Sequence, residues 1–170
     1  MLVSTKNKRE IKAESLRAAA RVMQRCDALA LASLNPDYIE RTYLSKAHAQ
    51  ANKIVEGWIS EAQMESWQDS VGNVWGRYTC KETNAPVLII GSHLDSVVNA
   101  GKYDGILGVL LGIELGNFLA RHQIDLPFHL DVVGFCDEEG VRFGATLLGS
   151  QALAGKWQPE WNELTDERGV

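Results

Sequence analysis

The chain has 170 residues, the size of one ordinary domain, and its 45% apolar and 23% charged residues are typical of a globular protein. Its formal net charge of −5 is mild, and without a cluster of Lys and Arg it excludes nucleic acid as a partner. No apolar run reaches the roughly 18 residues of a membrane span, and the first residues lack the apolar core of a secretory signal. The three cysteines are far apart and form no CxxC pair, which favours a reducing compartment and predicts a cytoplasmic protein.

The first half of the chain predicts two helices followed by two short strands. Apolar residues recur every three or four positions over residues 9–33, and Pro36 ends this pattern. A second helix is expected over residues 46–63, with Ser45 as its N-cap. Between residues 64 and 78, apolar residues alternate with polar ones and glycines punctuate the pattern, which indicates two short strands.

The second half alternates apolar strands with helices. Residues 86–91 form a continuous apolar run, as expected for a parallel strand that is covered on both faces. Residues 128–135 form a second such run, and helices are expected over residues 105–122 and 146–155. This order predicts an α/β fold with a mostly parallel central sheet. Ligands of such sheets bind at the carboxyl ends of the strands.

Polar side chains that can ligate a metal follow the strand over residues 86–91. His93 and Asp95 are two positions apart, so in extended chain they point to the same side, where Asp95 can orient the imidazole. The alternative is a strand-end histidine that only bonds to a loop. Asp104 stands directly before the next helix, where a carboxylate can either cap the helix or bridge two metal ions.

Three consecutive carboxylates follow the strand over residues 128–135. Asp137, Glu138 and Glu139 repel one another unless water or a cation offsets their charge. They form either a solvated acidic loop or part of a metal site at the same edge of the sheet as His93. In a metal site one glutamate can ligate while its neighbour takes a proton from a water molecule. The spacing alone does not say which glutamate has which role.

Three ordered segments resemble a known family of enzymes. "VGNVWGR", "GSHLDSVVNAGKYDGILGVLLGIE" and "DEEGVRFGATLLGSQALAG" are similar to the dinuclear metal amidohydrolases related to aminoacylase and carboxypeptidase G. The nearest branch is that of the N-carbamoyl-L-amino-acid hydrolases, β-ureidopropionases and allantoate amidohydrolases. The resemblance implies a three-layer α/β/α catalytic domain, and it covers residues 40–155 and the opening helix.

The resemblance also implies a role for each candidate site residue. His93 is expected to ligate one metal, with Asp95 orienting its imidazole, and Asp104 to bridge two metals. Glu139 is expected to ligate the second metal, and Glu138 to be the general base for the bridging water. The implied cofactors are two divalent metal ions per site, zinc in most members and manganese, cobalt or nickel in others. The implied reaction is hydrolysis of the C–N bond of a small carbamoyl, ureido or amide substrate.

The chain also departs from the family. Members are much longer, and residues 1–170 correspond to the N-terminal part of the catalytic domain, with the sheet incomplete on its C-terminal side. Two further histidine ligands, the inserted dimerisation or lid domain and the C-terminal catalytic segment have no counterpart here. We therefore expect a full-length homodimer to carry the activity, and the 170-residue chain alone to be inactive and to bind metal weakly. The alternatives are a dinuclear-zinc peptidase of the dipeptidase, tripeptidase or aminoacylase type and an inactive or non-enzymatic remnant.

Overall fold

A computed structural model describes residues 5–82 and 84–170 as four helices, a sheet and one 3₁₀ turn. The sheet residues are Glu65–Gln68 (β1), Val74–Tyr78 (β2), Val87–His93 (β3) and His129–Phe135 (β4). The helices are Thr5–Ala30 (α1), Lys46–Glu61 (α2), Ile106–Arg121 (α3) and Leu148–Leu153 (α4), and the 3₁₀ turn is Pro159–Glu163. All the elements predicted from the sequence are therefore present, with helix ends that differ by a few residues.

The strands form one sheet in the order β1-β2-β4-β3. β3 and β4 are parallel, in a register that pairs His93 with Phe135. The two other pairings, β1 with β2 and β2 with β4, are antiparallel. The predicted α/β class is confirmed, and the sheet is mixed rather than mostly parallel. The short connection between β1 and β2 can only form a hairpin, whereas α3 provides the crossover that parallel strands need.

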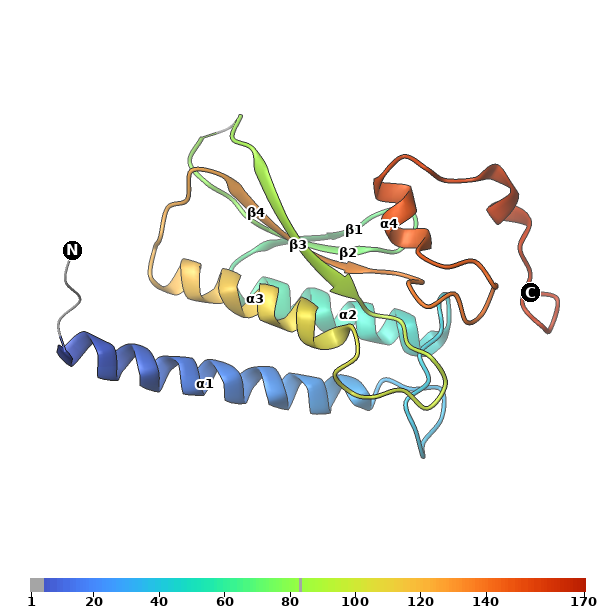
Figure 1. Cartoon of the computed structure of the whole chain (residues 1–170), viewed down its shortest axis with the longest axis horizontal. Helices are drawn as coiled ribbons and strands as arrows, with labels where there is room; N and C mark the ends of the chain where they lie inside the picture. The colour runs from blue at the N-terminus through green and yellow to red at the C-terminus, as the bar shows by residue number, and fades with distance from the viewer. Residues whose placement is uncertain (1–4, 83) are drawn as a thin grey trace.

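Helices α1, α2 and α3 lie on the same side of the sheet (Figure 1). α2 and α3 pack directly on the strands, and α1 runs along their outer side. The apolar stripe of α3 was predicted correctly, since all five residues assigned to it are buried: Ile106, Val109, Leu110, Ile113 and Leu119. Ser45 caps α2 as predicted, because its hydroxyl accepts the His48 backbone N–H at 3.1 Å. Of the described residues, none belongs to a helix long and apolar enough to cross a membrane.

Strand β3 differs from its prediction. The apolar run was expected to be covered on both faces, but Val87, Leu88 and Ile89 are 43%, 47% and 44% exposed. β3 is an edge strand of the described sheet, and helices cover only one face. An apolar run predicts burial only when helices cover both faces of the sheet, and no element of the described chain supplies the second layer here.

Candidate metal centre

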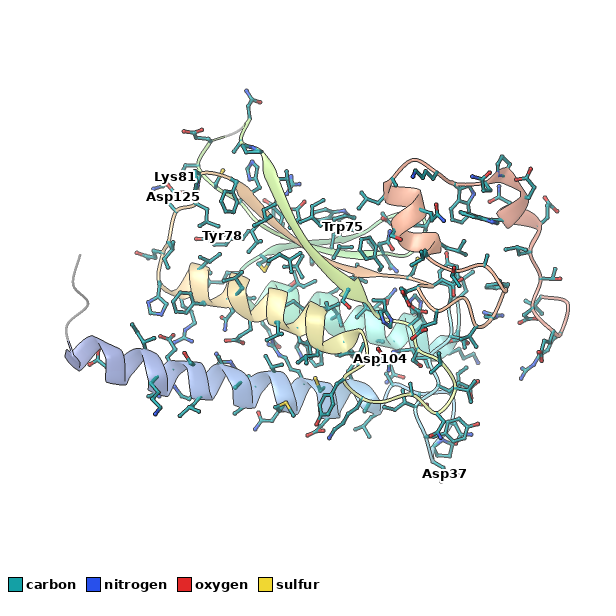
Figure 2. All side chains as sticks on the ribbon, in the orientation of Figure 1. Asp37, Trp75, Tyr78, Lys81, Asp104 and Asp125 are labelled. Atoms are coloured by element: carbon teal, nitrogen blue, oxygen red, sulfur yellow. The ribbon has the colours of Figure 1, made fainter. Side chains whose placement is uncertain are left out.

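Three potential metal ligands meet at the carboxyl ends of the two parallel strands. His93 is the last residue of β3, Glu139 follows β4, and Asp104 precedes α3. Figure 2 places Asp104 where the chain enters α3, beside the end of β3. Each of the three side chains offers one ligand atom, and these atoms all lie within 4.8 Å of one another. The structure thus brings together the three residues that the family resemblance implies as metal ligands.

The His93 ring is oriented from both of its nitrogens. Nδ1 lies 3.1 Å from the backbone oxygen of Asp95 and 3.6 Å from its carboxylate, so the hydrogen bond goes to the backbone. Nε2 faces the Asp104 carboxylate at 3.9 Å. Burial alone would lower the pKa of His93, but the contacts with Asp95 outweigh burial and raise it. With a proton on Nδ1, the neutral ring presents a free Nε2 lone pair to the centre.

Asp95 also holds the segment after β4. Its two carboxylate oxygens accept the backbone N–H groups of Glu138 and Glu139 at 3.0 and 3.1 Å. Burial opposes ionisation of Asp95, yet the nearby His93 ring and the bonds to these two N–H groups lower its pKa. The sequence assigned Asp95 to the imidazole alone. The link to the glutamates was not predictable, because nothing local to either segment indicates it.

Gly105 lets the loop after β3 approach the imidazole. Its φ of +66° is in the left-handed region, and a Cβ there would lie 2.5 Å from His93 Cε1 and Nε2. Gly105 is also the N-cap residue of α3, and no side chain caps this helix. The alternative role of Asp104 as a helix cap is therefore wrong. Its carboxylate is 57% exposed and points to the same centre as His93.

The carboxylates after β4 differ sharply in environment. Asp137 is 1% exposed, has a φ of +47°, and one of its carboxylate oxygens has no hydrogen-bond partner. Burial, followed by the charge of Asp95, raises the pKa of Asp137 to about 7. Burial and the neighbouring carboxylates also raise the pKa of Glu139, although His93 opposes this. An excess of negative charge that the protein does not offset is the environment in which a cation is stabilised.

The donor set fits a divalent metal ion. One imidazole nitrogen and two carboxylates are ligands that zinc, manganese, cobalt and nickel all accept. The centre is also accessible to solvent on the side of the exposed Asp104 carboxylate. The other three histidines lie elsewhere, as expected: His48 and His129 are buried, and His122 pairs with Glu14 on the surface.

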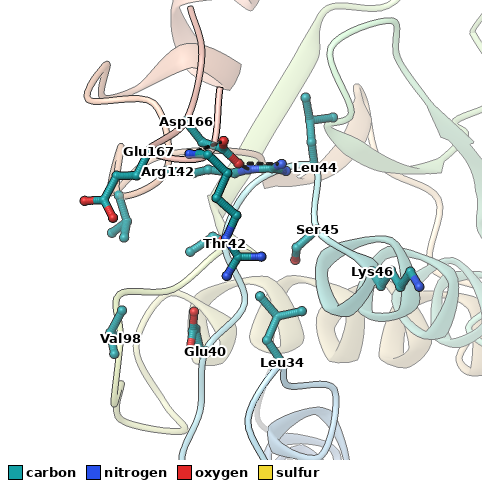
Figure 3. A pocket seen from close by; sticks show the side chains of 12 residues that line it. Leu34, Glu40, Thr42, Leu44, Ser45, Lys46, Val98, Arg142, Asp166 and Glu167 are labelled. Carbon is teal, nitrogen blue, oxygen red and sulfur yellow. Dashed lines mark hydrogen bonds and ion pairs between the residues drawn. The ribbon is translucent and has the colours of Figure 1, made fainter. Parts of the chain in front are cut away.

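A separate pocket of about 570 Å³ is lined by Arg142 and Asp166 among others, and by none of the three ligands. Figure 3 shows that Arg142 pairs there with Asp166, and the two bonds measure 3.0 Å at Nε and 2.9 Å at the terminal nitrogen. Arg142 also donates to the backbone oxygen of Tyr43 at 3.0 Å. These contacts anchor the loop after β4 to the segment that precedes α2.

Sequence reasoning missed two buried polar residues that support the site. Arg41 is 2% exposed and donates to the backbone oxygens of Leu94, Leu29 and Ala32, so it joins the end of β3 to the end of α1. Asn73 is completely buried beside the start of the carboxylate run. The sequence shows Gly72 before Asn73 and an apolar strand after it, but it does not show the partners of the Asn73 amide.

The mixed α/β sheet carries a histidine and two carboxylates at one edge, in positions where they could hold a metal ion. The model of peptidase family M28 matches residues 73–166, and the chain belongs to this family. The chain is 42% identical over 138 residues to an allantoate deiminase of Arabidopsis thaliana, and 39% identical over 132 residues to an N-carbamoyl-L-amino-acid amidohydrolase of a Pseudomonas strain. The predicted family and branch are thus confirmed.

These relatives are longer than the chain. Each match covers 78% of the chain, but only 26% of the Arabidopsis protein and 32% of the Pseudomonas protein. A solved hydantoinase/carbamoylase family amidase of Burkholderia ambifaria superposes with a TM-score of 0.82 at 29% identity, covering 89% of this chain and 37% of that one. The chain thus spans about a quarter to a third of the sequence relatives' length and somewhat more of the solved structure.

Proposed function

We propose that residues 1–170 are the N-terminal part of the catalytic domain of a metal-dependent amidohydrolase. The substrate class is a small carbamoyl or ureido compound, such as an N-carbamoyl-L-amino acid or allantoate. The observation that carries this proposal is the convergence of His93, Asp104 and Glu139 within 4.8 Å. The names of the relatives support the substrate class. The coverage of those relatives supports a longer parent, with an inserted dimerisation or lid domain and a C-terminal segment that complete the site.

His93, Asp104 and Glu139 would hold the metal, with Asp104 shared between two ions, most often zinc. A divalent ion bound there supplies Lewis-acid polarisation of the scissile carbonyl and makes a nearby water easier to deprotonate. Glu138 accepts the proton of the attacking water and passes it to the leaving nitrogen. Asp95 keeps the His93 tautomer correct and holds the backbone of both glutamates.

The three free, buried cysteines support the expected cytoplasmic location.

Metal binding by the chain itself tests the ligand assignment. We expect titration with Zn²⁺ or Co²⁺ to show weak binding that His93→Ala abolishes. The matched control is His122→Ala, which removes an exposed histidine that pairs with Glu14 and lies outside the centre. Tight binding of two ions by the isolated chain would contradict the incomplete site, and equal binding by both variants would contradict the ligand assignment.

Activity of the longer protein that contains this chain tests the substrate class. We expect hydrolysis of N-carbamoyl-L-amino acids, allantoate or 3-ureidopropionate that is lost on treatment with a chelator and restored by metal. A panel of dipeptides and N-acetyl amino acids serves as the comparison. Turnover of the peptides in place of the carbamoyl and ureido compounds would favour the alternative peptidase, and turnover of neither would contradict an enzymatic role.

A further inference from the structure

The segment from Cys136 to Gly149 forms a loop whose two ends are joined. The backbone N–H of Gly149 donates to Cys136 O, that of Leu148 to Asp137 O, and that of Leu147 to Glu138 O, each at 3.1 Å. This segment, which we call the carboxylate loop, contains Glu138 and Glu139. Its ends therefore set the position of the two glutamates relative to β4.

Asn73 bonds to both ends of the carboxylate loop. Its Oδ1 accepts the backbone N–H of Cys136 at 2.9 Å, and its Nδ2 donates to Gly149 O at 3.1 Å. The residue is completely buried and stands directly before β2, which pairs with β4. One side-chain amide thus bridges the exit of β4 and the first turn of α4.

Asp69 determines which way the Asn73 amide points. Asp69 Oδ2 accepts Asn73 Nδ2 at 2.8 Å and Trp75 Nε1 at 3.0 Å. Asp69 Oδ1 accepts three backbone N–H groups, including that of Asn73 at 2.9 Å. With Nδ2 held between Asp69 and Gly149 O, the amide oxygen must face Cys136, so no flipped orientation satisfies the same partners.

Gly149 is shaped for this contact. A Cβ at Gly149 would lie 2.6 Å from Cys136 O and 2.8 Å from Cys136 N, and closer still to Asn73 Oδ1. Any larger residue at position 149 would push this end of the loop away from Cys136 and Asn73. The close approach of the loop end to Asn73 therefore depends both on Asn73 and on the absence of a side chain at Gly149.

We propose that Asn73 is a positioning residue of the metal centre, acting through the backbone of the carboxylate loop to hold Glu138 and Glu139 in place. Its link to the reaction rests on the proposed function, whereas its control of the loop does not. Asp95 holds the two glutamate N–H groups from the side of β3, and Asn73 holds the loop ends from the side of β2. The loop is thus oriented by side chains of two different segments.

Asn73→Leu removes both loop contacts, and Asn52→Leu is its matched control. Asn52 is also buried, at 3% exposed, and its amide donates to Gly72 O at 3.2 Å without touching the loop. In the 170-residue chain, we expect Asn73→Leu to speed hydrogen exchange of the Leu147 and Leu148 amides about tenfold or more, as loss of one or two buried hydrogen bonds implies. Exchange in α3 should stay as in the unsubstituted chain, which shows that the fold is retained.

A second readout follows the metal centre itself. We expect the visible spectrum of bound Co²⁺ to change in Asn73→Leu and its affinity to fall about tenfold or more, with Asn52→Leu unchanged. Gly149→Ala approaches the same contact from the other end and should reproduce both effects if Asn73→Leu does not fold. Unchanged loop exchange in both Asn73→Leu and Gly149→Ala would overturn the proposal, as would equal effects in Asn52→Leu. If the unsubstituted chain binds no Co²⁺, the expected weak metal binding of the isolated chain is wrong, and the exchange result still decides the role of Asn73 in the loop.

Discussion

The two loops that build the candidate metal centre are organised in opposite ways. The loop after β3 carries Asp104 on an exposed arm, and Gly105 brings that arm against His93. The carboxylate loop after β4 is instead held at its base by two buried side chains of other segments, Asp95 and Asn73. The first loop is shaped mainly by its own backbone, and the second by side chains from other segments. Changes in the first should therefore act locally, and changes to the supports of the second should act at a distance.

The largest effect should come from the two glutamates of the carboxylate loop. In the longer protein, Glu138→Gln should lower kcat by about 10²–10⁴-fold, because a glutamine cannot accept the proton of the attacking water. Metal content should stay unchanged. Glu139→Gln is the matched variant, since it changes the neighbouring carboxylate and should lower metal affinity as well. The same pattern in both variants, measured by metal analysis and steady-state kinetics, would contradict the separate roles.

The loss of folding stability in acid should come from His48, which lies outside both loops. Burial, only partly offset by Asp95, lowers the pKa of His48 to about 4, so the folded state holds this ring neutral. In the unfolded chain the His48 ring takes up a proton below about pH 6.5. Neutral His48 therefore leaves the free energy of unfolding unchanged above that pH. The free energy of unfolding falls by up to about 3 kcal/mol as the pH drops towards 4. Urea unfolding of His48→Gln should show a shallower loss over this range. An unchanged slope would place the acid-sensitive group elsewhere.

Asp95 is the one side chain shared by the two loops. Asp95→Asn keeps one oxygen for one glutamate N–H but places an amide nitrogen against the other, so it should disturb both loops at once. We expect metal affinity to fall about 10–100-fold, as for other partners of metal-ligating histidines. Calorimetric titration measures this loss. The control is Asp69→Asn, which should alter the base of the carboxylate loop but leave the His93 ring shift in NMR spectra unchanged.

The smallest effect should follow a change confined to the loop after β3. Gly105→Ala requires an alanine at a φ of +66° and pushes the His93 ring aside, at a cost of about 1–3 kcal/mol. Thermal unfolding should show this loss. Metal binding should weaken, whereas hydrogen exchange of Leu147 and Leu148 should not change. Faster exchange at these two amides would show that the loops are coupled more strongly than their contacts indicate.

Much of the fold followed from local patterns. The apolar repeat of α3, the capping of α2 by Ser45 and the two apolar strands were all predicted, because each depends on neighbours within a few positions. The order of the strands was not predicted, nor was the exposure of β3. Both depend on which elements reach each face and edge of the sheet. An apolar run in the sequence does not distinguish a strand covered on one face from a strand covered on two.

For the site, the sequence by itself determined which side chains are candidate ligands. His93 ends β3, Glu139 follows β4 and Asp104 precedes α3, and the carboxyl ends of a parallel pair of strands meet at one edge of the sheet. Only the tertiary structure decided how these ligands are held. Asp95 reaches the Glu138 backbone across 43 residues of chain, and Asn73 reaches that of Cys136 across 63. Such contacts have no periodic or local signal, because they depend on the way the two loops fold back onto the same end of the sheet.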